Sequence, residues 1–314
     1  CGLVQWRASS SFRRCRGAFN TPMYELLARF WIGVVKLFRY VPMSARNRIA
    51  TVVGRLLWWA IPKRRHVTLT NLRLCFPEKT EAERVKLAHS LYKNMARAVL
   101  DHGVLWAGTA EEVDRMVRFE GIESVTGANG RPLIVISPHF VGLDAAGIAF
   151  NLHVRGCSLY QKQRNAAWDA AALAGRERFC QPELIAKTGR GDLKAVIRAM
   201  HKGLPFYYLP DLDHGRKHSI FVPGFGVPAA TVLMASGLAR VTGAKVCFCI
   251  TEMTAEGYVV HISPLWEDFP TEDYEADTRR ITANLEEWIR RLPDQYLWTH
   301  RRFKTRPDGE PSVY

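Results

Sequence analysis

The residues best suited to chemistry are a histidine and an aspartate that follow a short apolar run. Residues 132–137 (PLIVIS) predict a buried strand, and Pro138 ends it, so His139 emerges at the carboxyl end of the strand. Asp144 follows five positions later, where a helix of small residues begins. Across such a turn a carboxylate can bond one ring nitrogen and leave the other free as a base. The pattern therefore predicts a histidine base with Asp144 as its partner, and a purely structural histidine is the alternative.

A second polar block follows the apolar run of residues 206–209. It contains Asp211, Asp213 and Arg216. One interpretation is a wall of the site that positions an acceptor. The other is a turn, in which Asp and Gly serve the backbone and the cations lie in solvent.

The body of the chain alternates short apolar runs with helical patterns. This alternation predicts an α/β fold, a helix-flanked and largely parallel sheet whose strands are buried on both faces. The carboxyl ends of such strands are where sites form. We expect strands at residues 132–137, 157–160, 206–209, 246–251 and 258–262, and helices at residues 81–99, 111–116, 192–201, 229–241 and 272–292. Gly224 and Gly226 resemble part of a dinucleotide fingerprint, but Pro228 breaks the helix that this motif needs.

Charge is concentrated at one end of the chain. The 314 residues carry a net charge of +14, and residues 1–66 hold thirteen Lys/Arg against one acid, which is +12. The other 248 residues carry 31 basic and 29 acidic residues, which is +2. A nucleic-acid binder would need basic residues on the body, interleaved with stacking aromatics, so this class is disfavoured. The seven cysteines are odd in number and form no C-x-x-C, which favours free thiols.

The basic end contains two apolar segments. In residues 24–42 the charged side chains form one narrow helical stripe, and the longest uncharged run, residues 30–35, is too short to span a bilayer. Residues 48–62 repeat the composition and include Trp58 and Trp59, close to three basic residues. We expect two amphipathic helices in the membrane interface; a helix pair packed on the domain is the alternative. The expected division is a basic tail at 1–22, with Met23 as one candidate for the true start, membrane-associated helices at 23–62 and a catalytic domain at 63–314.

Several ordered segments resemble the lipid A biosynthesis (lauroyl/myristoyl) acyltransferases, within the lysophospholipid-acyltransferase-like superfamily. The H-x4-D spacing of His139 and Asp144 matches their signature. The other matching segments are residues 71–78 (NLRLCFPE), 221–230 (FVPGFGVPAA) and 295–306 (QYLWTHRRFKTR). The resemblance covers about residues 24 to 308, in order.

The resemblance implies transfer of a fatty acyl chain from acyl carrier protein to a hydroxyl of a membrane glycolipid, a lipid A precursor. It implies no metal or nucleotide cofactor, and a location at the cytoplasmic face of the bacterial inner membrane. His139 would deprotonate the acceptor, Asp144 would orient the imidazole, and Arg164 would contact a phosphate or the oxyanion. The alternatives are acylation of another lipid, such as a glycerophospholipid or a mannosylated glycolipid, and a non-catalytic protein that binds a membrane surface.

Overall fold

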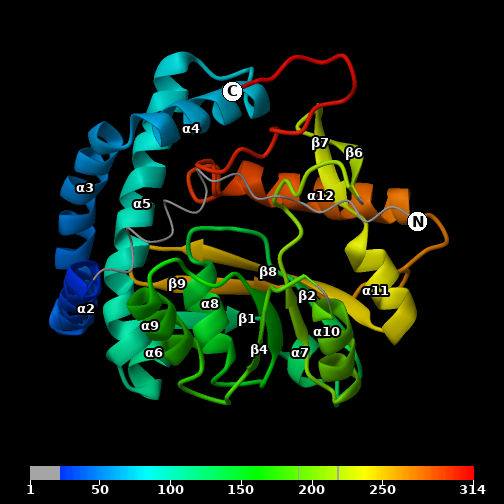
Figure 1. Ribbon diagram of the computed structural model, residues 1–314, viewed down its shortest axis with the longest axis horizontal. Coiled ribbons are helices and arrows are strands. Elements are labelled where there is room, and N and C mark those ends of the chain that lie inside the picture. Colours follow the sequence, from blue (N-terminus) through cyan, green and yellow to red (C-terminus); the bar gives the residue numbers. More distant parts are fainter. Residues whose placement is uncertain (1–21, 190, 218) are drawn as a thin grey trace.

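A seven-stranded sheet forms the centre of the molecule (Figure 1). The computed structural model describes residues 22–189, 191–217 and 219–314, so the predicted tail at 1–22 lies outside the described residues except for Pro22. The strand order is β1-β9-β8-β2-β5-β3-β4, and every neighbouring pair is parallel except β8 and β9. The prediction of a largely parallel α/β fold is confirmed. The strands are β1 (Val117–Glu120), β2 (Leu133–Ile136), β3 (Cys157–Tyr160), β4 (Glu183–Ala186), β5 (Phe206–Tyr208), β8 (Lys245–Met253) and β9 (Tyr258–Ile262).

Helices cover both faces of this sheet (Figure 1). The described part of the chain begins with α2 (Pro22–Leu37), a 3-10 turn η1 (Phe38–Tyr40), α3 (Met43–Ala60), α4 (Pro62–Cys75) and the long α5 (Glu81–Ala107). The later helices are α6 (Ala110–Met116), α7 (Glu123–Thr126), α8 (Leu143–Phe150), α9 (Ala166–Arg176), α10 (Asp192–His201), α11 (Met234–Thr242) and α12 (Tyr274–Arg291).

Strand β2 shows why its sequence is continuously apolar. Leu133 and Val135 pack in the cluster that contains α8, whereas Ile134 and Ile136 pack in the cluster that contains α10, α11 and α12. All four side chains are fully buried. Alternate residues of a strand point to opposite faces, so a strand covered on both sides needs apolar side chains at every position.

The prediction of a helix at residues 229–241 is partly wrong. Strands β6 (Ser219–Gly224) and β7 (Val227–Val232) form an antiparallel hairpin there, and α11 begins only at Met234. The two loop residues, Phe225 and Gly226, have φ of 54° and 75°. Positive φ at both central positions is the conformation that tight hairpins favour, and Pro228 cannot donate the backbone hydrogen bond that a helix needs. Strands β1 and β4 were also not expected from the sequence.

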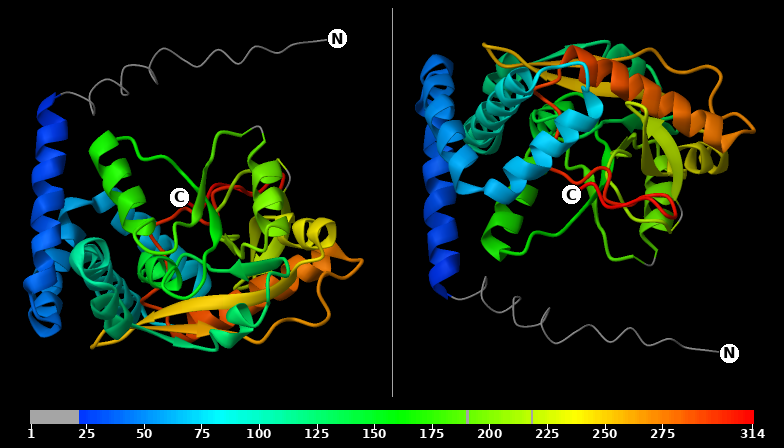
Figure 2. Two further views of the ribbon diagram at one scale, coloured as in Figure 1. Left: turned by 90° about the horizontal axis from the view of Figure 1, so that it is seen from below. Right: turned by 90° about the horizontal axis from the view of Figure 1, so that it is seen from above.

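Helices α2 and α3 pack closely on α5 (Figure 1). A Cβ at Gly54 of α3 would lie 2.7 Å from the Cα of Lys93, and a Cβ at Gly103 of α5 would lie 2.7 Å from the carbonyl oxygen of Val35. These glycines allow the helix backbones to approach each other directly. Both views of Figure 2 show α2 at the outer edge of the molecule, with α9 beside it. None of the described helices combines the length and apolar character needed to cross a bilayer.

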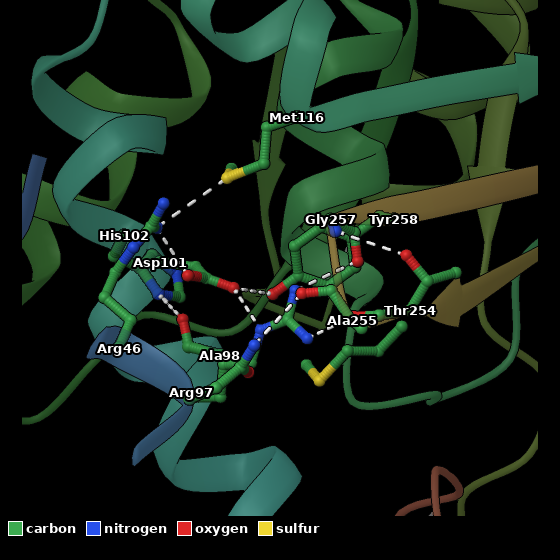
Figure 3. A network of polar contacts seen from close by, with 12 residues as sticks. Arg46, Arg97, Ala98, Asp101, His102, Met116, Thr254, Ala255, Gly257 and Tyr258 are labelled. Atoms are coloured by element: carbon green, nitrogen blue, oxygen red, sulfur yellow. Dashed lines mark hydrogen bonds and ion pairs between the residues drawn. The ribbon is translucent and has the colours of Figure 1, made fainter. Parts of the chain in front are cut away.

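A buried ionic network joins α3, α5 and the turn between β8 and β9 (Figure 3). Asp101 accepts hydrogen bonds from Arg46 Nη1 at 2.5 Å, from Arg97 Nε at 3.2 Å and from the Tyr258 hydroxyl at 2.7 Å. Arg97 also donates to the carbonyl oxygens of Thr254 and Gly257. The carboxylate is fully buried, and both guanidinium groups are nearly so. Helix α3 is thereby fixed to α5, the helix whose His102 reaches the candidate site.

Replacing Asp101 with alanine is expected to lower the free energy of unfolding by about 3–5 kcal/mol, because two buried guanidinium groups lose their counter-ion. Urea unfolding followed by circular dichroism measures this loss. Glu287→Ala is the control, since it removes only an exposed pair with Arg291 on α12, worth about 0.5 kcal/mol. A loss for Asp101→Ala no larger than that of the control would contradict the structural role of the network.

Candidate active site

Two neighbouring strands deliver His139 and Asp211 to the same edge of the sheet. Strands β2 and β5 are parallel and in register, with Ile136 opposite Tyr208 at their carboxyl ends. Each strand is followed by one residue, a proline and then the polar residue, in the sequences Ser-Pro-His and Leu-Pro-Asp. His139 and Asp211 therefore occupy equivalent positions beyond two adjacent strands. Parallel strands end at the same edge, so the two side chains meet there.

The carboxylate of Asp211 holds both the ring and the backbone of His139. Asp211 Oδ1 lies 2.8 Å from His139 Nδ1, and Oδ2 accepts the His139 backbone N–H at 2.9 Å. The Tyr296 hydroxyl also hydrogen-bonds this carboxylate, whose side chain is fully buried. An acceptor at Nδ1 fixes the proton on that nitrogen and leaves the lone pair on Nε2. Nε2 has no hydrogen-bond partner among the described residues, and this is the arrangement that a general base needs.

The pKa values of His139 and Asp211 are shifted in opposite directions, each toward the charged form of its group. Burial lowers the pKa of His139, but the charge of Asp211 and its hydrogen bond more than offset burial, so the pKa lies above its usual range. Burial raises the pKa of Asp211, but the charge of His139 and the hydrogen bonds that His139 donates have the larger effect. The net result is a pKa lowered to about 2. Nearby His300 has its pKa lowered to about 4, chiefly by burial. Near neutral pH, Asp211 is therefore a carboxylate and His300 is neutral.

The hydrogen bonds of Asp144 go to groups other than His139, its predicted partner. Asp144 lies in the first turn of α8 and bonds side chains of α5 and α9. It accepts two hydrogen bonds from Arg176, from Nη2 at 2.6 Å and from Nε at 3.1 Å, and lies 3.2 Å from His102 Nε2. Burial opposes ionisation of Asp144, but Arg176 and His102 hold its pKa well below the usual range. The turn that begins α8 at Leu143 directs Asp144 to these two side chains.

His139 and Asp144 nevertheless line one cavity of about 470 Å³. His102 and Arg176 line it as well, and both are hydrogen-bonded to Asp144, so polar groups of α5, α8 and α9 meet in its wall. The rest of the lining is mainly apolar and comes from α8, β3, β4 and β5. A concave apolar pocket with a few convergent polar groups is the usual form of a small-molecule site.

Asp211 contacts His139 but does not itself line this cavity, and the other three predicted site residues also lie outside the lining. Arg164 is exposed in the loop between β3 and α9. Asp213 accepts hydrogen bonds from the backbone of Thr305 at 2.7 Å and from Gly215 at 2.9 Å. Arg216 donates to the carbonyl oxygen of Arg306 and pairs with Asp308 at 2.8 Å. The contacts of Asp213 and Arg216 are those of the turn alternative, and they fasten this loop to the C-terminal segment.

The sequence interpretation missed two roles. Asp211 was placed among substrate-binding residues, although the repeated Xaa-Pro-polar pattern after two predicted strands was a signal for its pairing with His139. The role of Arg176 was not predicted, because nothing local in the sequence shows that the end of α9 meets the start of α8. Within residues 22–189, 191–217 and 219–314, no group of three or more His, Cys, Asp or Glu side chains is placed to hold a metal ion.

Comparison with known proteins identifies the class of enzyme, an acyltransferase. The family model for bacterial lipid A biosynthesis acyltransferases matches residues 18–305, and the chain belongs to this family. The chain is thus an acyltransferase of lipid A biosynthesis, as the resemblance implied. This assignment favours lipid A over the other lipids considered and sets aside the non-catalytic binder.

Relatives with different acyl chains in their names support this assignment. The chain is 31% identical to the lipid A biosynthesis palmitoleoyltransferase of Escherichia coli over 96% of its own length and 99% of the relative. It is 31% identical to the lauroyltransferase of E. coli, covering 94% and 99% of the two chains. It is 28% identical to the E. coli myristoyltransferase, covering 90% and 89%. A solved 1-acyl-sn-glycerophosphate acyltransferase from Thermotoga maritima aligns with 81% of this chain at 12% identity and a TM-score of 0.40, too low to carry an argument.

Proposed function

We propose that this enzyme transfers a fatty acyl chain from acyl carrier protein to a hydroxyl of a lipid A precursor, with His139 as the general base. The observation that carries the proposal is the 2.8 Å contact between His139 Nδ1 and buried Asp211 beside an apolar cavity. It leaves Nε2 as the proton acceptor, with space beside it for an acyl chain.

The reaction follows from this geometry in two proton transfers. His139 Nε2 removes the proton of the acceptor hydroxyl as the oxygen attacks the thioester carbonyl. The new C–O ester bond forms, the C–S bond breaks, and the imidazolium returns its proton to the leaving thiolate. Asp211 stabilises the imidazolium in between, since it remains a carboxylate.

Asp144 acts in this scheme through its two hydrogen-bond partners. It holds Arg176 and His102 in the cavity wall, where the positive charge of Arg176 faces the same space as His139. Positive charge that is fixed before the reaction can stabilise the oxyanion of the tetrahedral intermediate. The H-x4-D pattern then supplies the base from its first residue and an anchor for Arg176 from its second.

The proposed location is the cytoplasmic face of the bacterial inner membrane. Helix α2 buries only Ala28, Ile32 and Val35, and it leaves large apolar side chains exposed. The large apolar side chains that are exposed on α2, η1 and α3 are Met23, Tyr24, Leu26, Leu27, Phe30, Trp31, Leu37, Tyr40, Ile49, Val52, Leu56 and Trp59. Such a surface, flanked by basic residues, suits an interface with anionic lipids. We retain the proposed division into a tail at 1–22, membrane-associated helices at 23–62 and a catalytic domain at 63–314.

The donor is tested by offering the purified full chain two thioesters of the same acyl chain, one on acyl carrier protein and one on coenzyme A. The acceptor is a lipid A precursor in mixed vesicles, and product is measured by mass spectrometry. We expect ester formation from the carrier-protein thioester at the higher kcat/KM. Equal or better use of the coenzyme A thioester would refute the proposed donor, and no ester from either thioester would refute the proposed reaction.

The rate of acyl transfer is expected to rise with pH and to level off above the pKa of His139. Protonated His139 cannot accept the acceptor proton, and Asp211 keeps its pKa above the 6.5 of an ordinary histidine. The inflection in kcat/KM should therefore lie above 6.5. The profile is measured with enzyme-free thioester hydrolysis subtracted at each pH. A rate that falls with rising pH over this range would rule out His139 as the base.

A further inference from the structure

The cavity extends along the whole of α8. Its lining includes Asp144 in the first turn of this helix, Gly147 in the middle and Phe150 at the end. It also includes both ends of β3, from Tyr160 to Cys157. Since β2 and β3 run parallel within the sheet, Tyr160 lies at the edge of His139 and Cys157 lies at the opposite edge. The cavity therefore leads from the site toward the far edge of the sheet, over about 10 Å of helix.

Gly147 leaves the middle of this cavity open. A Cβ at Gly147 would meet one atom within 4 Å, the Tyr207 Cε1 at 4.0 Å. Other glycines of this region are required by close packing. A Cβ at Gly142 would lie 2.7 Å from Thr251 Cγ2, and one at Gly175 would lie 2.2 Å from the Trp106 ring. Gly147 sits inside a helix, where glycine is unfavourable, and neither packing nor a positive φ requires it. What its missing side chain preserves is the open space of the cavity.

Phe150 lines the cavity at the C-terminal end of α8. Its side chain is 3% exposed, and its ring centroid lies 5.9 Å from that of Tyr207. A Cβ at Gly156 would lie 3.5 Å from Phe150 Cε1 and 3.2 Å from the carbonyl oxygen of Pro205. The ring, the start of β3 and the residue before β5 are therefore packed together. About 5 Å, one turn of α8, separates Gly147 from Phe150.

We propose that Gly147 and Phe150 set the length of the acyl chain that this enzyme accepts, with Gly147 admitting the chain past the middle of α8 and Phe150 stopping its end. The inference rests on the proposed function, in which the cavity holds the donor's acyl chain. A side chain at position 147 removes the space of several methylenes, whereas a smaller one at position 150 adds space. The two changes should shift the preferred chain length in opposite directions.

The test uses full-length wild type and the variants Gly147→Ala, Gly147→Leu and Phe150→Ala with saturated acyl carrier protein thioesters from octanoyl to stearoyl. For Gly147→Leu we expect the preferred chain to become shorter and the kcat/KM for the wild type's preferred chain to fall about 10- to 200-fold relative to shorter chains. Gly147→Ala should give a smaller shift in the same direction, and Phe150→Ala a shift to longer chains. Ile148→Val is the control, because Ile148 is a fully buried neighbour that does not line the cavity, and its profile should match wild type.

Thermal unfolding of each variant separates loss of fold from loss of specificity, and Gly147→Ala keeps the test available if Phe150→Ala fails to fold. The acyl chains on lipid A from cells expressing each variant provide a second profile that does not depend on the donor's carrier. Transfer with an unchanged chain profile in folded Gly147→Leu, or a uniform loss over all chains, would overturn the inference and leave the proposed function standing. No transfer by wild type in either assay would overturn both.

Discussion

Replacing His139 with alanine is expected to lower kcat for acyl transfer by about 10²–10⁴-fold, because the acceptor hydroxyl loses its general base. The fold should be retained, since the His139 side chain is partly exposed and the neighbouring backbone is held independently by the Leu297 amide, which donates to the carbonyl oxygen of His139 at 3.0 Å. The measurement is initial-rate formation of acylated lipid A precursor by purified protein, with thermal unfolding as the check on folding.

His261 provides a matched control for this substitution. Its Nε2 lies 2.8 Å from a carboxylate oxygen of Glu252, the same separation as between His139 and Asp211, but it lies on β9 and does not line the cavity. His261→Ala should keep the rate close to wild type. A His139→Ala variant that is folded and as active as His261→Ala would contradict the assignment of the base.

Replacing Asp211 with asparagine is expected to cost about 10²–10⁴-fold in kcat without removing the imidazole. An amide N–H directed at His139 Nδ1 would favour the tautomer with its proton on Nε2, which has no lone pair to accept a proton. The variant also removes the charge that raises the pKa of His139. The inflection of the pH–rate profile should therefore move to lower pH, a change that a merely structural aspartate would not produce.

Asp277→Asn is the control for a buried carboxylate. Asp277 lies on α12 and is 1% exposed. Its carboxylate accepts a hydrogen bond from the Thr271 backbone N–H, and it does not line the cavity. Its substitution should leave both the rate and the position of the inflection unchanged. If Asp211→Asn lowers the rate no more than Asp277→Asn does, or lowers it with no shift of the inflection, Asp211 does not act through His139.

Much of the fold could be predicted from local patterns. The strands β2, β3, β5, β8 and β9 were predicted to within a few residues, because each is an apolar run bounded by turn residues. Strand β4 was missed because its apolar run, residues 184–186, is only three residues long. Residues 229–232 were misassigned to a helix, since Ala-rich sequence favours helix and only the hairpin pairing with β6 overrides that preference.

The sequence could place each site residue at the end of its own strand, but it could not show which strands are neighbours in the sheet. His139 follows one strand and Asp211 another, and their meeting depends on β5 lying directly beside β2. Sequence proximity favoured Asp144 as the partner, but α8 directs it to His102 and Arg176, which come from helices far along the chain. The concentration of positive charge in residues 1–66 could be seen in the sequence. The apolar surface that α2 and α3 expose beside it depends on which helix faces α5 covers.

The most direct test of the central claim is mass spectrometry of lipid A from three bacterial strains that lack their own enzyme of this family, expressing wild type, His139→Ala or no protein. Equal amounts of folded protein in the first two strains are verified by quantitative blotting and limited proteolysis. The account predicts one additional ester-linked acyl chain on lipid A with wild type, and its absence in the other two strains. The same acylated lipid A with His139→Ala as with wild type would contradict the account.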